Sequence, residues 1–264
     1  MKKHGLEHEK TERYDSRDEK CAKRGSRCLI QLARNGLLFN GTPQDLDVLR
    51  LKFARDHYVI LPQLFEPALL EQILRRVHDA KFLPRDHIGI ALELCMADNM
   101  TTAMLRFLPS NPAFLRIVEH ITGNPHIGEF VGRVYKMESS GGHYDSWHDD
   151  CIEHRVVTMS VNLSPRPFQG GALQLKHLHS EAILQEICNT GLGDALLFRI
   201  SADLVHRVQG VIGDHPKIAL AGWFTEGDDL LPNLGKWMGA SAATIANPAN
   251  DQPSWEISAP PKRE

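Results

Sequence analysis

The stretch YDSWHDDCIEHRVVTMSVNLSPRPFQGGALQL, residues 144–175, decides how this chain folds and what it can bind. It contains His148-Asp149-Asp150, in which a histidine and a carboxylate stand two residues apart. Side chains alternate between the two faces of a strand, so His148 and Asp150 are expected on the same side of an extended segment. One imidazole nitrogen and one carboxylate oxygen could then reach a single cation. The pattern predicts half of a metal site.

A second histidine for such a site, His206, follows in FRISADLVHRVQG, residues 198–210. Two histidines and one carboxylate on one face of a metal, with open positions opposite, form the ligand set of non-haem Fe(II) oxygenases. A His-x-Asp triplet alone is weak evidence, because the chain has 14 histidines and also contains His143-Tyr144-Asp145. The rest of the pattern has to choose between the two triplets.

The composition is that of an ordinary globular protein: 264 residues, 42% apolar and 24% charged. A net charge of -3 gives no reason to expect a nucleic-acid partner. No apolar run reaches membrane-spanning length, and the N-terminus lacks an apolar signal core. We therefore expect a soluble cytoplasmic protein that binds neither nucleic acid nor membranes.

The cysteine pattern gives no sign of a disulfide framework. The count is odd, the spacing is wide and no CxxC pair occurs, which favours free thiols in a reducing compartment. The five are Cys21, Cys28, Cys95, Cys151 and Cys188. Strand alternation predicts that the side chain of Cys151 points with Asp149, away from the metal.

The chain divides into one folded domain, residues 28–230, between a charged N-terminal tail, 1–27, and a C-terminal extension, 231–264. A helical region is expected over about 42–123. Its helices begin at Thr42-Pro43, near Pro67 and at Asn111-Pro112, and Gly123 ends the last. Residues 80–100 give mixed signals, which we interpret as loops and short helices.

After Pro125 the period changes to that of strands. Runs at 130–137, 156–163, 172–175, 195–200 and 218–224 are separated by Gly, Pro, Asn and Asp clusters, as in an antiparallel sandwich or jelly roll. The expected fold is mainly β with helical additions (α+β), with its β core at about 126–226.

Within this core a series of motifs follows in a fixed order. A strand tyrosine, a Gly-Gly turn and the His-x-Asp pair come first, followed by an Arg/Thr strand start. A Phe with Gly-Gly, a Gly-Asp turn, the distal histidine and a lysine six positions before Trp-Phe complete the series. In chain order the residues are Tyr135, Gly141, Gly142, His148, Asp150, Arg155, Thr158, Phe168, Gly170, Gly171, Leu173, Gly193, Asp194, Phe198, Ser201, His206, Val208, Lys217, Trp223 and Phe224. This region resembles the double-stranded β-helix (jelly-roll) core of Fe(II)- and 2-oxoglutarate-dependent dioxygenases, especially their prolyl-hydroxylase-like branch.

The resemblance implies a catalytic domain with Fe(II) on His148, Asp150 and His206, and its register selects this triplet over His143/Asp145. His143 would then lie in a loop near the mouth of the site. The cosubstrates implied are 2-oxoglutarate and O2, with ascorbate as a reductant.

The same resemblance assigns Lys217 to the far carboxylate of 2-oxoglutarate, where the family more often has arginine. Tyr135, Asn162 and Thr158 stand where the family places additional hydrogen-bonding groups. For Asn162 a turn residue at the strand end, and for Tyr135 core packing, are equally weighted alternatives. Ala219 replaces a serine or threonine often found two residues after the basic residue.

The implied activity is hydroxylation of an unactivated C–H bond in an amino acid, a peptide or protein side chain, or a small metabolite, with succinate and CO2 as co-products. The presence of Asp150 favours hydroxylation over halogenation. Alternatives are desaturation, epoxidation or cyclisation with the same cofactors, a zinc hydrolase, and a catalytically inactive jelly-roll binding module.

Four residues on or beside the core strands are candidates for substrate contact: Tyr144, Trp147, Gln174 and Arg199. Arg199 could hold a substrate carboxylate, although strand alternation favours a surface-facing arginine. The helices could buttress the β core or form a homodimer surface, and the sequence leaves both open.

Overall fold

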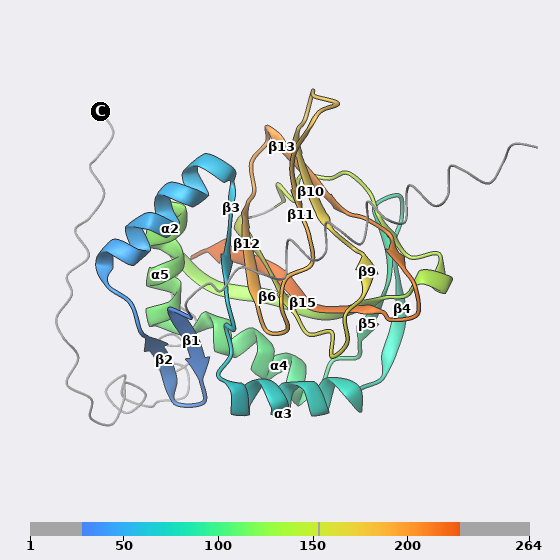
Figure 1. Cartoon of the computed structure of the whole chain (residues 1–264), viewed down its shortest axis with the longest axis horizontal. Coiled ribbons are helices and arrows are strands. Elements are labelled where there is room, and N and C mark those ends of the chain that lie inside the picture. Colours follow the sequence, from blue (N-terminus) through green and yellow to red (C-terminus); the bar gives the residue numbers. More distant parts are fainter. Residues whose placement is uncertain (1–27, 153, 228–264) are drawn as a thin grey trace, which may run out of the picture.

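A computed structural model describes residues 28–152 and 154–227, and one large antiparallel sheet organises this part of the chain (Figure 1). A short strand, β7 (Tyr144–Asp145), pairs with β5 (Ala91–Met96), which lies next to the edge strand of that sheet. The strands, in spatial order, are β3 (Tyr58–Leu61), β12 (Ala195–Arg199), β8 (Arg155–Asn162), β15 (Lys217–Glu226), β6 (Ile127–Met137), β5 (Ala91–Met96) and β4 (Phe82–His87), with β7 at Tyr144–Asp145.

A smaller sheet faces the large one and closes the roll. It runs in the order β11 (Ile183–Ile187), β10 (Leu173–His177), β13 (Leu204–Val208). Two further pairs are β9 (Gln169–Gly170) with β14 (Val211–Ile212), and β1 (Ile30–Ala33) with β2 (Gly36–Phe39). A cavity between the sheets is lined from both sides, for example by Thr158 of β8 and His206 of β13. The predicted fold class, mainly β with a jelly-roll core and helical additions, is confirmed.

Strand β8 shows how the large sheet separates the apolar core from the cavity. Val157, Met159 and Val161 are fully buried in the main apolar cluster. The intervening residues, such as Thr158 and Ser160, line the cavity instead. Because side chains alternate along the strand, polar groups lie on the cavity face of the sheet and apolar groups pack on the opposite face.

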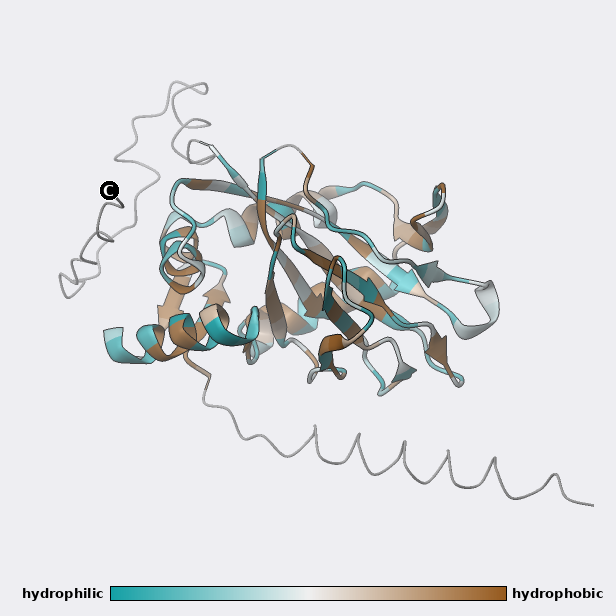
Figure 2. Cartoon of the chain, turned by 90° about the horizontal axis from the view of Figure 1, so that it is seen from above, coloured by the Kyte–Doolittle hydropathy of each residue, from teal (hydrophilic) through white to brown (hydrophobic). Residues whose placement is uncertain are grey.

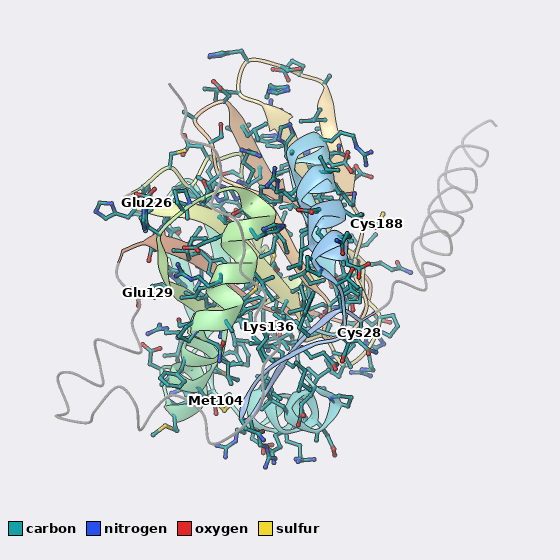
Figure 3. The ribbon with its side chains drawn as sticks, turned by 90° about the vertical axis from the view of Figure 1, so that its left-hand side faces the viewer. Cys28, Met104, Glu129, Lys136, Cys188 and Glu226 are labelled. Atoms are coloured by element: carbon teal, nitrogen blue, oxygen red, sulfur yellow. The ribbon has the colours of Figure 1, made fainter. Side chains whose placement is uncertain are left out.

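Four helices cover the outer face of the large sheet: α2 (Pro43–Asp56), α3 (Pro67–His78), α4 (Met100–Phe107) and α5 (Pro112–Thr122). Figure 3 shows α2 and α5 side by side against the strands. Single-turn helices η1 (Leu108–Ser110) and η2 (Ser139–Gly141) lie in the connections. In Figure 2 the strands through the middle of the domain are largely apolar, whereas turns at its rim are largely hydrophilic.

The helix ends follow the sequence signals. Thr42 caps α2, accepting from Asp45 N–H while the Asp45 carboxylate accepts from the Thr42 backbone, which is a capping box. Asn111 caps α5, and Gly123 ends it in the left-handed region at φ 74°. The predicted helix starts at Pro43, Pro67 and Pro112 are confirmed.

Part of the expected helical region is sheet. Residues 80–100, predicted as loops and short helices, form the β4–β5 hairpin and the start of α4. Charged residues within these strands, such as Arg85 and Glu93, obscured the alternation, because their partners lie on other elements. Strands β11 and β13 were also missed. The predicted tail, 1–27, and the whole extension, 231–264, lie outside the described residues.

No helix in the described part of the chain has the length and apolar character needed to cross a membrane.

Candidate active site

His148, Asp150 and His206 converge on one point at the cavity wall. One donor atom from each lies within 4.8 Å of the others. His206 Nε2 is 3.3 Å from Asp150 Oδ2, and His148 Nε2 is 3.6 Å from Asp150 Oδ1. Donors at this spacing fit around a single cation, since metal–donor distances are about 2 Å.

A backbone bridge fixes the two histidines beside each other. His148 N–H donates to His206 O at 3.0 Å, and His206 N–H donates to His148 O at 2.8 Å. Their ring centroids are 4.2 Å apart. The segment after β7 and strand β13 are therefore joined by backbone hydrogen bonds at the two histidines that supply donor atoms.

Asp150 reaches this point by a turn, not by strand alternation. Its φ is 58°, in the left-handed region that aspartate enters more readily than most residues. Cys151 N–H donates to Asp149 Oδ1 at 3.0 Å, and Ile152 N–H donates to Asp150 O at 2.7 Å. The expectation of an extended His148–Asp150 segment is wrong, although the two side chains converge.

Neighbouring groups orient the donors. His148 Nδ1 is 2.7 Å from Ser146 O, so the Nδ1–H tautomer is favoured and Nε2 is left to face Asp150 and His206. Trp223 Nε1 donates to Asp150 Oδ2 at 2.7 Å. Burial opposes ionisation of Asp150, but hydrogen bonds from His206 and Trp223, with the histidine charges, outweigh it and lower its pKa to about 2.

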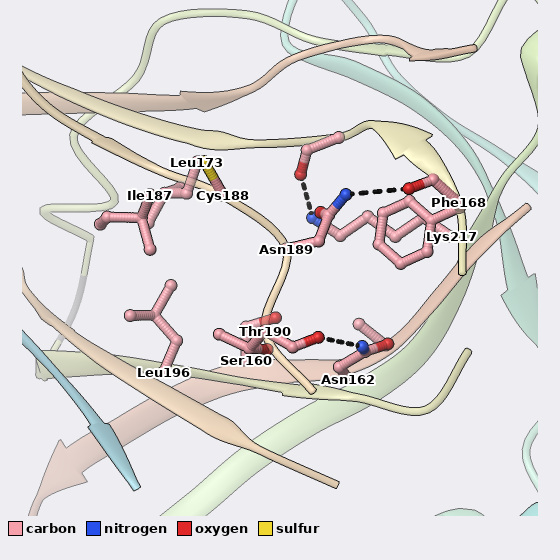
Figure 4. A pocket seen from close by; sticks show the side chains of 12 residues that line it. Ser160, Asn162, Phe168, Leu173, Ile187, Cys188, Asn189, Thr190, Leu196 and Lys217 are labelled. Carbon is pink, nitrogen blue, oxygen red and sulfur yellow. Dashed lines mark hydrogen bonds between the residues drawn. The ribbon is translucent and has the colours of Figure 1, made fainter. Parts of the chain in front are cut away.

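Lys217 lines both the main cavity and a smaller pocket that adjoins it. Figure 4 shows Lys217 in the smaller pocket. Its Nζ donates to Gly171 O at 2.7 Å. An ammonium has three N–H donors, and among the described residues Lys217 Nζ donates no other hydrogen bond. Burial lowers the pKa of Lys217 to about 8, against the opposing charge of Asp145. This is a half-buried cation with N–H donors that remain available for a ligand.

Tyr135, Thr158 and Asn162, the predicted additional hydrogen-bonding groups, differ in whether their polar atoms are free to bind a ligand. The Tyr135 hydroxyl interacts with Ser160 in the cavity wall, and burial raises the pKa of Tyr135 well above its usual range. Thr158 Oγ1 is buried and has no hydrogen-bond partner within the described residues.

Asn162 is engaged at the end of β8. Its Nδ2 donates to Thr190 O at 2.7 Å (Figure 4). Its Oδ1 accepts from Ser164 N–H at 2.9 Å. It lines the smaller pocket beside Lys217. Its polar groups hold the strand end in place, and one amide N–H remains for a ligand.

The histidine and the aspartate of the alternative triplet, His143 and Asp145, do not converge on a shared point. His143 Nδ1 accepts from Glu138 N–H at 2.8 Å within its loop. Asp145 lines the cavity, accepts from Val208 N–H at 2.9 Å, and lies 3.5 Å from His148 Nδ1. Burial raises the pKa of Asp145, against the opposing charges of His148 and His206. Asp145 is a cavity residue that sequence reasoning missed.

The four residues expected to contact substrate do not line the cavity beside the triad. Gln174 donates to Glu186 and accepts from Arg207, and Arg207 also lies over the ring of Trp147. Tyr144 is exposed.

Arg199 pairs with Val157, on the helix side of the sheet, and its guanidinium lies 5.1 Å from the Phe53 ring centroid. The register therefore turns Arg199 to the face opposite the cavity, which is the face that strand alternation favoured over contact with a substrate carboxylate.

Two charged cavity residues were also missed, Glu93 and Arg133. Arg133 Nε donates to Glu93 Oε1 at 2.7 Å, and Glu93 is 6% exposed. A signal for Arg133 was present, because it stands two residues before Tyr135 and so shares its face of β6.

Comparison with known proteins agrees with this geometry. Residues 132–225, from β6 to β15, match the model of the 2OG-Fe(II) oxygenase superfamily. None of the curated protein sequences compared with this chain matches it.

Solved structures with a similar fold include a prolyl-4-hydroxylase from Pseudomonas putida, at 16% identity and TM-score 0.51, covering 69% of this chain and 99% of that one. A prolyl hydroxylase from Trichoplax adhaerens, in complex with a hypoxia inducible factor peptide fragment, is 17% identical with TM-score 0.53, covering 71% and 94%. The non-heme alpha ketoglutarate dependent epimerase SnoN from nogalamycin biosynthesis is 15% identical with TM-score 0.52, covering 70% and 84%. At these identities the likeness concerns the fold.

The roll, the converging triad and the matched segment define an oxygenase of the Fe(II)/2-oxoglutarate type. Residues 132–225 match the 2OG-Fe(II) oxygenase superfamily, and the fold of this chain is similar to that of prolyl hydroxylases.

Proposed function

We propose that this enzyme is an Fe(II)- and 2-oxoglutarate-dependent hydroxylase of an unactivated C–H bond in an amino acid, a peptide or protein side chain, or a small metabolite. The observation that carries the proposal is Lys217: a half-buried ammonium with unused donors in the same cavity as two histidines and a carboxylate. A metal site for hydrolysis has no need of this cation, whereas a dicarboxylate cosubstrate does.

The residues fit both groups. Fe(II) would be held by Nε2 of His148 and His206 and by the Asp150 carboxylate, leaving positions for exchanging ligands. Lys217 would bind the far carboxylate of 2-oxoglutarate, and the unpartnered Thr158 hydroxyl would supply a further hydrogen bond. Iron, 2-oxoglutarate and O2 together would supply the oxidising power, with succinate and CO2 as co-products.

The protein's own contribution is orientation. Trp223 and Arg155 hold the Asp150 carboxylate from one side, since Trp223 Nε1 donates to it and Arg155 Nη1 lies 3.5 Å from it. Ser146 O fixes the His148 ring. The cavity lies between the two sheets, so the substrate would meet the metal ligands inside the roll.

The test is anaerobic visible absorption of the purified protein with Fe(II), before and after 2-oxoglutarate is added. A new charge-transfer band that needs both, and is lost in His148→Ala, is expected. Succinate release and a substrate mass increase of one oxygen atom would then separate hydroxylation from desaturation, cyclisation or epimerisation. Omitting ascorbate should shorten the period of turnover. Iron binding without a band would reject 2-oxoglutarate as cosubstrate.

A further inference from the structure

The cavity contains a second cation, Arg133, that the proposed chemistry does not use. We infer that Arg133 binds a carboxylate of the primary substrate, so that the enzyme acts on a carboxylate-bearing compound. This inference rests on the proposed oxygenase function and concerns the substrate class of the same site.

The position of Arg133 gives it access to the space above the sheet. It pairs with Ala221 of β15, and Ala221 pairs in turn with Ser160 of β8. Arg133, Ala221 and Ser160 all line the cavity. Because the two residues that follow Arg133 in this row have short side chains, a ligand can approach the end of the arginine from their side.

The guanidinium is held at one edge only. Nε donates to Glu93 Oε1, and no hydrogen bond to either terminal nitrogen occurs among the residues that the structure describes. A guanidinium has five N–H donors in a planar fork. The edge formed by the two terminal nitrogens therefore remains free, and that edge matches a carboxylate bidentately.

The local charge also favours an anion. Glu93 is the acidic partner of both Arg133 and Arg85, whose Nη1 lies 3.5 Å from the same Oε1. The Cys95 thiol also donates to that oxygen, at 3.3 Å. One carboxylate between two guanidiniums leaves an excess positive charge in a half-buried wall, which a bound anion would neutralise.

The site is close to the proposed chemistry. The guanidinium carbon of Arg133 is 5.5 Å from the Trp223 ring centroid, and the indole N–H of Trp223 holds Asp150. A carboxylate on Arg133 would thus lie beside the indole, and the oxidised carbon would lie farther along the substrate, toward the triad. Lys217 stands two same-face positions before Ala221, the residue of β15 that pairs with Arg133. The anion site at Arg133 is therefore separate from Lys217.

The experiment uses the full chain loaded with Fe(II) and 2-oxoglutarate without O2. The probes are α-amino acids and aliphatic carboxylic acids, each paired with its carboxamide, and short peptides in which Asp or Glu is paired with Asn or Gln. Binding is read from the shift of the charge-transfer band. At least one acid should bind about 30-fold more tightly than its amide, as expected for a buried charge pair. An acid preference confined to the peptides would assign the carboxylate to an acidic side chain.

Three variants distinguish binding from structural support. Arg133→Lys keeps the charge beside Glu93 but lacks the planar fork, and should lower the acid preference at least about tenfold. Glu93→Gln should strengthen acid binding, because it removes the competing carboxylate, whereas a purely structural pair would be damaged by both changes. Arg106→Lys is the matched control, since Arg106 Nε donates to Gly132 O from a helix on the other side of β6.

Equal binding of acids and amides across the panel, or an unchanged preference in Arg133→Lys, would overturn the inference. Failure of the proposed function is a different result, namely no charge-transfer band in the wild type. In that event calorimetry of the same acid and amide pairs on metal-free wild type and Arg133→Lys still decides whether Arg133 binds carboxylates.

Discussion

Replacing Lys217 by methionine should weaken 2-oxoglutarate binding and stabilise the ligand-free protein at once. Burial lowers the pKa of Lys217 from 10.5 to about 8. The unfolded chain therefore holds more protons than the folded chain between these values, and the free energy of unfolding rises with pH across that window. At pH 7 the lysine is charged in both states, so the full cost of burying the charge is present.

That cost is up to about 3 kcal/mol at 1.36 kcal/mol per pKa unit, taken as an upper limit because the residue is only half-buried. Lys217→Met removes it, so the metal-free variant should melt several degrees higher at pH 7, with the difference shrinking toward pH 10. Loss of the buried charge pair should cost about 2–4 kcal/mol of 2-oxoglutarate binding, or about 30- to 1000-fold in Kd.

Two assays measure these effects: thermal unfolding of metal-free protein from pH 7 to 10, and anaerobic titration of the Fe(II) form with 2-oxoglutarate. Iron affinity should be unchanged. Lys136→Met is the matched control, since Lys136 lies on the neighbouring strand and pairs with Glu138 outside the cavity. A Kd within about threefold of wild type, or a variant that is less stable at pH 7, would refute the reasoning.

Three further results are expected. Trp223→Phe removes the hydrogen bond to Asp150 and should lower Fe(II) affinity about 10- to 100-fold in a competition titration; unchanged affinity would show that the indole does not support the ligand. The wild-type Kd for 2-oxoglutarate should be flat below pH 8 and rise above it, as Lys217 loses its proton; a flat profile to pH 9.5 would exclude this. Thr42→Ala breaks the cap of α2 and should cost about 1 kcal/mol in urea unfolding with no change in 2-oxoglutarate binding.

The sequence predicted those parts of the fold and of the site whose signals come from residues close together in the chain. Thr42-Pro43 and Asn111-Pro112 mark helix starts because capping is a contact between near neighbours in the chain. The candidate metal residues were found because the motifs around them follow a fixed order. Even there the local geometry was misjudged, since the left-handed turn at Asp150 gives no signal in a His-x-Asp triplet.

The missed features depend on strand pairing. Glu93 appears as an ordinary surface charge until β5 is placed beside β6, where Arg133 becomes its partner. For Arg199, strand alternation favoured the face away from the cavity, but only its pairing with Val157 shows that helices cover this face. A charge in a strand is informative only once its register is known.

The bridge between His148 and His206 has a mechanical consequence. It joins the segment after β7, which is anchored on the large sheet, to β13 of the small sheet. A cation shared by these histidines would add a removable cross-link at the seam where the two walls of the roll meet, and would stabilise the closed form by mass action. Amide hydrogen exchange along β13 should accordingly slow when metal is added, so that opening of the roll and loss of metal become one event.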